Sequence, residues 1–394
     1  MTQTYPQKAA AEAPVHAHWS AVFSIALSVV SLVTAELLPI SLLTPIATDL
    51  GISEGMAGQA VSATSIMGMI ASLFIAAACR SLDRRLVLMG FTLISIASNV
   101  LVAAAPDYTV LLIGRLLLGI SLGGFWSMAA AVSMRLVHKS LIPKALSVIF
   151  GGVSVAMAVA TPLGTWLGDA MGWRGVFLVT AALGIITLVW QYRVFPSMKP
   201  AGQTRLSTLF GLLKRPQIRL AMAGMVGVFG GHFAFFTYLR PLLENVAHFS
   251  VSGVSAILLG FGIANILGTA ASGMMLRRSL KGTLLVMPLI LALMAAVLVR
   301  FGESQPVTAI MVTLWGFVFG AVPVAWTTWL TRAVPDETES GGGLQVASIQ
   351  LAITAGATLG GLLLDAHGTL GTVTGSGIIL LLAAGLIGFM RCKS

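Results

Sequence analysis

The sequence is divided into twelve long apolar runs, and this feature constrains the fold more than any other. Each run is close to the roughly 20 residues that a helix needs to cross a bilayer core of about 30 Å. The runs do not alternate polar and apolar residues, as the wall of a membrane barrel must. The sequence therefore predicts an all-α membrane protein with twelve transmembrane helices, at residues 19–45, 56–79, 86–105, 109–134, 144–168, 174–192, 219–243, 252–275, 283–300, 306–331, 343–364 and 370–390.

The composition excludes a soluble enzyme. Only 9% of the residues are charged and 57% are hydrophobic, whereas soluble domains carry about 25% charged residues. Two cysteines, Cys79 and Cys392, are too few for a disulfide scaffold or a cysteine-rich metal site. We find no clustered His, Asp and Glu metal set and no nucleophile motif, so we expect no cofactor, no metal and no enzymatic activity. The alternative from a different class is a non-transporting membrane sensor or a membrane-embedded enzyme.

The positive charge, +10 in total, reports the orientation of the chain. Most of the 23 lysines and arginines fall in the loops of one side, with Arg174, Arg240 and Arg300 on the other and Arg115 inside a run. Because cytoplasmic loops are enriched in Lys and Arg, we expect both termini and the 193–218 connection to be cytoplasmic. The charge is thus a topology signal, and we expect no nucleic-acid partner.

The second half of the chain repeats features of the first half at a constant distance of 196 residues. The matched pairs are Pro45 and Pro241, Gly124 and Gly320, Leu163-Gly164 and Leu359-Gly360, Asp169-Ala170 and Asp365-Ala366, Gly172 and Gly368, and Gly175 and Gly371. Six runs per half give both halves the same orientation, which is a parallel repeat. We therefore expect a cytoplasmic tail at 1–18, six-helix bundles at 19–192 and 219–394, and a cytoplasmic linker at 193–218.

Three ionisable residues within the runs are candidates for proton coupling, because charges at membrane depth are costly and mark functional sites. Glu36 lies about 13 Å and Arg115 about 9 Å below the outer ends of their runs, at 1.5 Å per residue. His232 is the counterpart of Glu36 in the repeat. We expect Glu36 to carry the proton, Arg115 to tune it, and His232 to contact substrate or share the relay. The alternatives are a static Glu36–Arg115 bridge and a packing histidine.

Aromatic and amide side chains within the runs are candidates for substrate contact. Trp126 follows Arg115 on one helical face, through Gly119 and Leu122. Flat rings stack on sugars or nucleobases, and amides hydrogen-bond to their edges. These side chains therefore suit the binding of a neutral polar organic solute. The alternatives are packing or lipid contact for the aromatic residues and bridging between helices for the amides. The candidates are Trp126, His232, Phe235, Phe236, Tyr238, Asn265, Trp326 and Gln350.

Several motifs resemble those of the major facilitator superfamily. The loop Arg80-Ser81-Leu82-Asp83-Arg84-Arg85 is similar to its loop signature in a degenerate form, without the leading glycine. The resemblance implies that Asp83, Arg84 and Arg85 control the conformational switch. Gly114-Arg115 with Gly119 looks like the arginine signature associated with proton coupling. Thr161-Pro162-Leu163-Gly164 resembles the antiporter glycine–proline signature, with threonine in place of a glycine, which adds Pro162 and Gly164 to the switch residues.

The resemblance extends to the drug:proton antiporter group, and within it to bacterial purine ribonucleoside exporters, with sugar efflux transporters as near relatives. The similar stretches are 19–23, 42–55, 123–136, 143–151 and 233–241. The resemblance implies a monomeric antiporter of the bacterial inner membrane that exports nucleosides for protons by alternating access, with the lipid bilayer as its surroundings. Sugar efflux and multidrug efflux by the same mechanism are the alternatives.

Overall fold

The chain folds into helices throughout its described part. The computed structural model describes residues 18–79, 81–138, 141–198, 211, 214–334 and 338–390, and these contain no strand. Residues 1–17 of the expected tail at 1–18 and most of the expected linker lie outside them. The elements are α1 Trp19–Ser41, α2 Leu43–Leu50, α3 Glu54–Ala78, α4 Arg84–Ala103, α5 Tyr108–Leu136, α6 Ile142–Val194, α8 Pro216–Phe236, α9 Leu239–Pro241, the π-helical η2 Leu242–Val246, α10 Val251–Arg278, α11 Leu280–Phe301, α12 Gln305–Ala333 and α13 Thr338–Gly388.

Ten helices of the described residues are long and apolar enough to cross a membrane. Two of them, α6 and α13, are about twice as long as a span requires, with 53 and 51 residues. Each covers two of the twelve apolar runs expected from the sequence. The chain is therefore a multi-pass membrane protein in which two pairs of runs are joined without a separate loop.

Glycine makes both joints possible. Within α6, Gly172 has φ 76° and ψ 158°, and within α13, Gly368 has φ 69° and ψ −174°. This region of backbone conformation is essentially restricted to glycine, because any Cβ would clash with the main chain. The two glycines are 196 residues apart, which is the distance of the sequence repeat.

Side-chain caps begin several of the helices. The Asp83 carboxylate accepts from the N–H of Arg85 at the start of α4, and Asp107 accepts from the N–H of Val110 at the start of α5. Ser250 and Ser279 do the same for α10 and α11. Such caps satisfy N–H groups that have no partner inside the helix, so short polar loops suffice between the spans.

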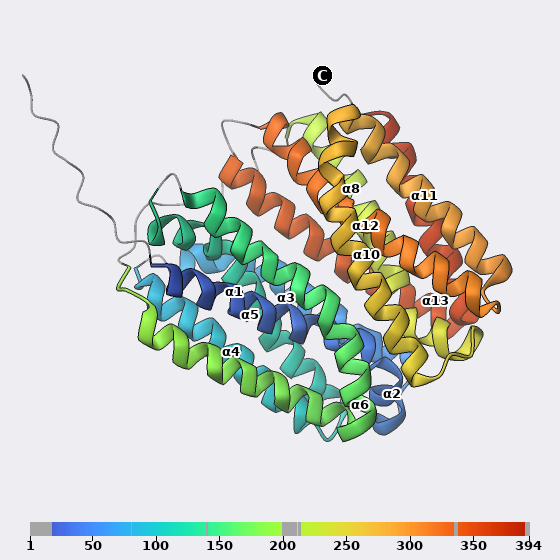
Figure 1. Cartoon of the computed structure of the whole chain (residues 1–394), viewed down its shortest axis with the longest axis horizontal. Helices are drawn as coiled ribbons and strands as arrows, with labels where there is room; N and C mark the ends of the chain where they lie inside the picture. The colour runs from blue at the N-terminus through green and yellow to red at the C-terminus, as the bar shows by residue number, and fades with distance from the viewer. Residues whose placement is uncertain are drawn as a thin grey trace, which may run out of the picture.

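The helices of the first half of the chain, residues 18–198, gather on one side of the molecule, and those of the second half, residues 214–390, gather beside them (Figure 1). We call these the N-half and the C-half. Within the N-half, α1 packs on α6 and α3 on α5; within the C-half, α8 packs on α13 and α10 on α12. The halves meet chiefly where α3 packs on α13 and α6 on α10.

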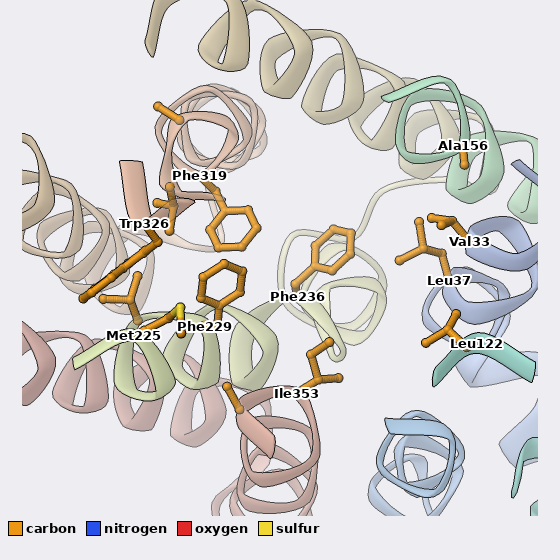
Figure 2. Packing of buried hydrophobic residues seen from close by; sticks show 14 of the residues in the cluster. Val33, Leu37, Leu122, Ala156, Met225, Phe229, Phe236, Phe319, Trp326 and Ile353 are labelled. Atoms are coloured by element: carbon orange, nitrogen blue, oxygen red, sulfur yellow. The ribbon is translucent and has the colours of Figure 1, made fainter. Parts of the chain in front are cut away.

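Buried hydrophobic side chains fill the interior of both halves and reach their interface. In Figure 2, Val33, Leu37 and Leu122 face Phe236 and Ile353 across this interface. All five are buried and belong to one apolar cluster. This part of the interface between the halves is therefore lined by apolar side chains, which sets the few polar groups near it apart.

Candidate functional site

A proline in α1 creates the first polar feature near the interface. Pro39 has no N–H, so the carbonyl of Ala35 loses the partner that it would have four residues later in a helix. Arg115 of α5 supplies the missing donor, with 2.7 Å between its Nη1 and the Ala35 oxygen. The arginine signature of α5 is thus positioned by the proline of α1.

The other nitrogens of the Arg115 guanidinium also donate to backbone carbonyls. Its Nη2 donates to the carbonyl of Glu36 at 3.1 Å, and its Nε donates to the carbonyl of Ala60 in α3 at 3.2 Å. Its side chain is 1% exposed. Thr64 closes the arrangement by donating to the carbonyl of Arg115 itself at 3.2 Å. Arg115 therefore ties α1, α3 and α5 together at membrane depth.

The Glu36 side chain lies beside this cluster without being bound by it. Among the residues that the structure describes, its carboxylate has no hydrogen-bond partner, and it interacts with Arg115 through charge alone. Glu36 follows Val33 by one helical turn and precedes Leu37, and both of these face the interface (Figure 2). A carboxylate so placed can exchange a proton or bind a polar solute, because no partner occupies it.

His232 of α8 lies in an aromatic cluster of the C-half. Phe319 stacks on its ring with centroids 3.3 Å apart, and Phe236 stacks with centroids 5.1 Å apart. Its Nδ1 accepts from Trp315 Nε1 at 3.0 Å, which assigns the ring proton to Nε2. The side chain is 0% exposed, and Nε2 has no partner in the described structure. A buried donor without an acceptor costs about 1–3 kcal/mol, so this nitrogen is a group that a ligand could satisfy.

The structure does not bring the three expected proton-coupling residues into one hydrogen-bonded chain. Glu36 and Arg115 are neighbours through the backbone of α1. No hydrogen bond joins Glu36 to His232 in the described part of the chain, and each lies on its own side of the interface. Sequence spacing identified residues of similar depth, but the covering of His232 by Phe236 and Phe319 depends on side-chain packing, which spacing does not contain.

The aromatic candidates divide into two groups. Of the candidates, Phe236 lies toward the interface, together with Phe229 and Phe319 (Figure 2). Phe235 instead stacks on Trp315 at 4.1 Å, inside the C-half. Trp326 is buried and contacts Trp329 edge to face, and Trp126 contacts Phe125 in the same way. Phe229 and Phe319 were missed by sequence reasoning, although their spacing from His232 and Trp326 places them on the same helical faces.

The polar candidates of the C-half serve contacts between helices in this conformation. Asn265 donates to the carbonyl of Gly316, which joins α10 to α12. The Gln350 amide lies against α3, since a Cβ at Gly68 would be 2.7 Å from its Nε2. Tyr238 donates to the carbonyl of Ala357 at 2.7 Å.

The loop residues expected to control the switch bind within the N-half. Asp83 accepts from Ser197 Oγ at 2.6 Å and from the N–H of Met198 at 2.9 Å. The hydrogen bond from Ser197 holds the pKa of Asp83 below its usual value. Arg84 donates to the carbonyl of Cys79, and Arg85 donates to the carbonyl of Tyr192. This loop thus fastens the segment after α6 to the start of α4.

Pro162 and Gly164 lie in α6, where α1 and α10 approach it. A Cβ at Gly164 would be 2.6 Å from Ser41 Oγ and 2.9 Å from Leu38 Cδ2, so glycine permits close packing on α1. Beside it is a cavity of about 150 Å³ between α1 and the two arms of α6, lined by Val30, Thr34, Leu38, Val159, Leu163 and Val179 among others. This lining is apolar and lies on the face of α1 opposite Glu36, so the cavity does not suit a polar solute. No group of three metal-binding side chains occurs among the described residues.

Comparison with known proteins identifies the family. The family model described as Major Facilitator Superfamily (MFS_1) matches residues 21–345. The chain belongs to the major facilitator superfamily. Two relatives with which this superfamily member is 45% identical are the purine ribonucleoside efflux pumps NepI of Salmonella enteritidis PT4 and Salmonella typhi. Each match extends over 387 residues, or 98% of this chain and 97% of the relative.

Solved structures with the same fold agree with the superfamily assignment. A bacterial homolog of the human lysosomal transporter Spinster, in an inward-facing and unoccupied conformation, matches with a TM-score of 0.76 and 15% identity over 95% of this chain and 97% of the other. Its inward-facing and occupied form matches with a TM-score of 0.75 and 15% identity, over 96% and 97% of the two chains. Because its 45%-identical relatives are efflux pumps and its family model is that of the Major Facilitator Superfamily, the protein is a secondary transporter and not an enzyme.

Proposed function

We propose that this transporter exports purine ribonucleosides across the bacterial inner membrane in exchange for protons. The observation that carries the proposal is the 45% identity, over nearly the whole of both chains, with pumps named for purine ribonucleoside efflux. The aromatic side chains near the interface are consistent with a solute that has a flat ring and polar edges. So are the Glu36 carboxylate and His232 Nε2, which have no hydrogen-bond partner in the described part of the chain. Alternating access by the two halves delivers the solute from one side of the membrane to the other.

The architecture that we propose for this process has twelve membrane helices in two parallel six-helix repeats. Dividing α6 at Gly172 and α13 at Gly368 converts the ten long helices into twelve spans. The packing of α1 on α6 and of α3 on α5 corresponds to that of α8 on α13 and of α10 on α12. In this proposal the bundles are 19–192 and 219–394, and the Lys and Arg distribution places both termini in the cytoplasm.

Glu36 is the proposed proton carrier. Its carboxylate is near the interface and has no hydrogen-bond partner among the described residues. It interacts electrostatically with Arg115. Arg115 keeps a fixed position because its donors are bound to the carbonyls of Ala35, Glu36 and Ala60. The proton is then exchanged by Glu36, the member of the pair whose side chain has no hydrogen-bond partner among the described residues, while the arginine stays charged.

His232 is the proposed substrate contact of the C-half. Its Nδ1 is occupied by Trp315, which leaves the Nε2–H to donate to an acceptor on the solute. Phe236 and Phe319 lie against its ring and are the proposed stacking surface for a base. His232→Phe keeps an aromatic ring but removes this donor, and it also leaves the buried Trp315 Nε1–H without its acceptor, so we expect weaker nucleoside binding together with a loss of thermal stability.

One experiment tests the proposal as a whole. The purified protein is reconstituted in vesicles, and proton release is followed after addition of inosine, arabinose or a lipophilic cation. We expect release with inosine. A signal with arabinose or the cation alone would instead indicate a sugar or multidrug exporter.

The same vesicles test the role of Glu36. Glu36→Gln should abolish inosine-dependent proton release while inosine binding persists, because an amide side chain does not release a proton at the pH of the assay. Glu303→Gln is the matched control, since Glu303 is an exposed acid after α11. Full proton release by Glu36→Gln would contradict the carrier assignment.

A further inference from the structure

A second proline, Pro45 in the first turn of α2, leaves another buried carbonyl without a partner from the backbone that follows it. Ser41 is the last residue of α1, and α2 begins at Leu43. In a continuing helix the Ser41 carbonyl would accept from the N–H of residue 45, but Pro45 has no N–H. Ser41 is fully buried, so water does not replace the missing donor, and the carbonyl needs a partner from elsewhere in the fold.

That partner comes from the other half of the molecule. Nη1 of Arg240, in α9, donates to the Ser41 carbonyl. Its Nε donates to Glu244 Oε1 at 2.8 Å, in an ion pair formed within the C-half. The Arg240 side chain is only 7% exposed. Because Glu244 neutralises the guanidinium inside its own half, the bond to Ser41 can break without separating the charge from its counterion.

Other hydrogen bonds between the halves lie at the same end of the interface. Ser53 donates to Asp365 Oδ2 at 2.9 Å. Thr358 of α13 donates to Gln59 Oε1 at 3.1 Å, and its Oγ1 lies 3.0 Å from Ser62 Oγ in α3. Together with Arg240 these groups close one end of the interface, and opening that end must break them.

We propose that Arg240 is the latch of the gate that closes this end of the transporter. It stabilises the closed state by bonding to the carbonyl that Pro45 leaves free, and it moves away with Glu244 still paired when the halves separate there. The latch requires only that the halves move relative to each other, so it goes beyond the proposed substrate and proton coupling.

A cysteine pair measures the closed state directly. Ser62→Cys and Thr358→Cys are combined in a chain in which Cys79 and Cys392 are replaced by serine, and the rate of disulfide formation is followed under mild oxidation. The two hydroxyl oxygens are 3.0 Å apart in the closed state. Arg240→Ala should slow the cross-link roughly threefold or more, because removing the latch shifts the population toward the open gate.

Arg174→Ala is the matched control. Arg174 also pairs with a carboxylate, Asp49, and donates to a backbone carbonyl, that of Ala105, but both partners belong to the N-half. Its replacement should leave the cross-linking rate unchanged. Cross-linking of Arg240→Ala at the parent rate, or equal slowing by Arg174→Ala, would overturn the latch.

Pro45→Ala is a second, independent variant that keeps Arg240. The new N–H can bond to the Ser41 carbonyl and compete with Arg240 for it, so we expect slower cross-linking in the same direction. If Arg240→Ala does not fold, Pro45→Ala tests the proposal on its own. An unchanged rate of cross-linking in Pro45→Ala would then reject the latch. The assay uses neither nucleoside nor a proton gradient, so its outcome is separate from that of the proposed export activity.

Discussion

At the scale of the residue, the polar chemistry near the interface is organised by carbonyls that prolines leave free. Pro39 frees the carbonyl of Ala35, which binds Arg115, and Pro45 frees that of Ser41, which binds Arg240. In both places an arginine is fixed by backbone atoms and not by an acidic side chain of the opposite helix. This arrangement leaves the Glu36 carboxylate available for exchange.

The partnership of Arg115 with Pro39 predicts coupled effects on stability. Arg115→Ala should lower the free energy of unfolding by about 3 kcal/mol, because buried carbonyls lose charged donors. Pro39→Ala restores an N–H for the Ala35 carbonyl, so the double variant should recover about 1 kcal/mol relative to additivity. Thermal unfolding in detergent measures both. Strictly additive losses would contradict the pairing.

The depressed pKa of Asp83 predicts a pH dependence of the loop before α4. A group whose folded pKa is lowered contributes stability above its unfolded pKa of about 3.9, and this contribution is lost as the pH falls through the folded pKa. The difference in melting temperature between the parent and Asp83→Asn should therefore be largest near neutral pH and shrink as the solution is acidified below about pH 4. A difference independent of pH would show that the charge of Asp83 is not involved.

At the scale of the element, α6 and α13 show how a membrane helix can reverse without a loop. Their breaks at Gly172 and Gly368 rely on a backbone conformation that other residues avoid. Pro162 lies in the first arm of α6, where it frees the carbonyl of Ala158. A Cβ at Gly262 of α10 would be 3.2 Å from this carbonyl oxygen, so α10 crosses α6 about one turn before the proline.

These joints predict strong effects of a single methyl group. Gly172→Ala and Gly368→Ala should each cost about 1–3 kcal/mol of stability, because alanine is strained at positive φ with an extended ψ. Gly273→Ala is the control: this residue is inside α10 with open space around it, and alanine should be neutral or stabilising there by up to about 1 kcal/mol. Thermal unfolding of the three variants distinguishes strain from a general effect of losing glycine.

At the scale of the whole molecule, the two halves pack closely at positions where glycine leaves room for the neighbouring helix. Gly262 of α10 lies close against α6, since a Cβ at this position would be 2.6 Å from the Cα of Ala158. Gly262→Val should therefore wedge the halves apart at this crossing and reduce transport roughly tenfold, since packed interfaces tolerate extra volume poorly. Gly273→Val, on an exposed face of α10, should retain transport. Equal activity of the two variants in vesicles would contradict the role of this crossing.

The sequence predicted much of the fold and less of the site. Apolar runs located every long helix, because the bilayer requires about 20 apolar residues per span, and the 196-residue repeat pointed to Gly172 and Gly368. It did not predict that these runs join without loops, because the runs themselves do not show where a single glycine reverses the chain. Depth counting placed Glu36 and Arg115 as neighbours. It could not show that Arg115 binds carbonyls, or that Arg240 crosses to the other half, because those contacts depend on tertiary packing.

The glycine breaks of α6 and α13 also bear on how the protein is made. The two arms of each helix are joined at a single residue, with no loop between them. We therefore expect the two arms of each pair to enter the lipid together, as a helical hairpin. A substitution at Gly172 or Gly368 would then impair insertion during synthesis, before the transporter can bind a solute.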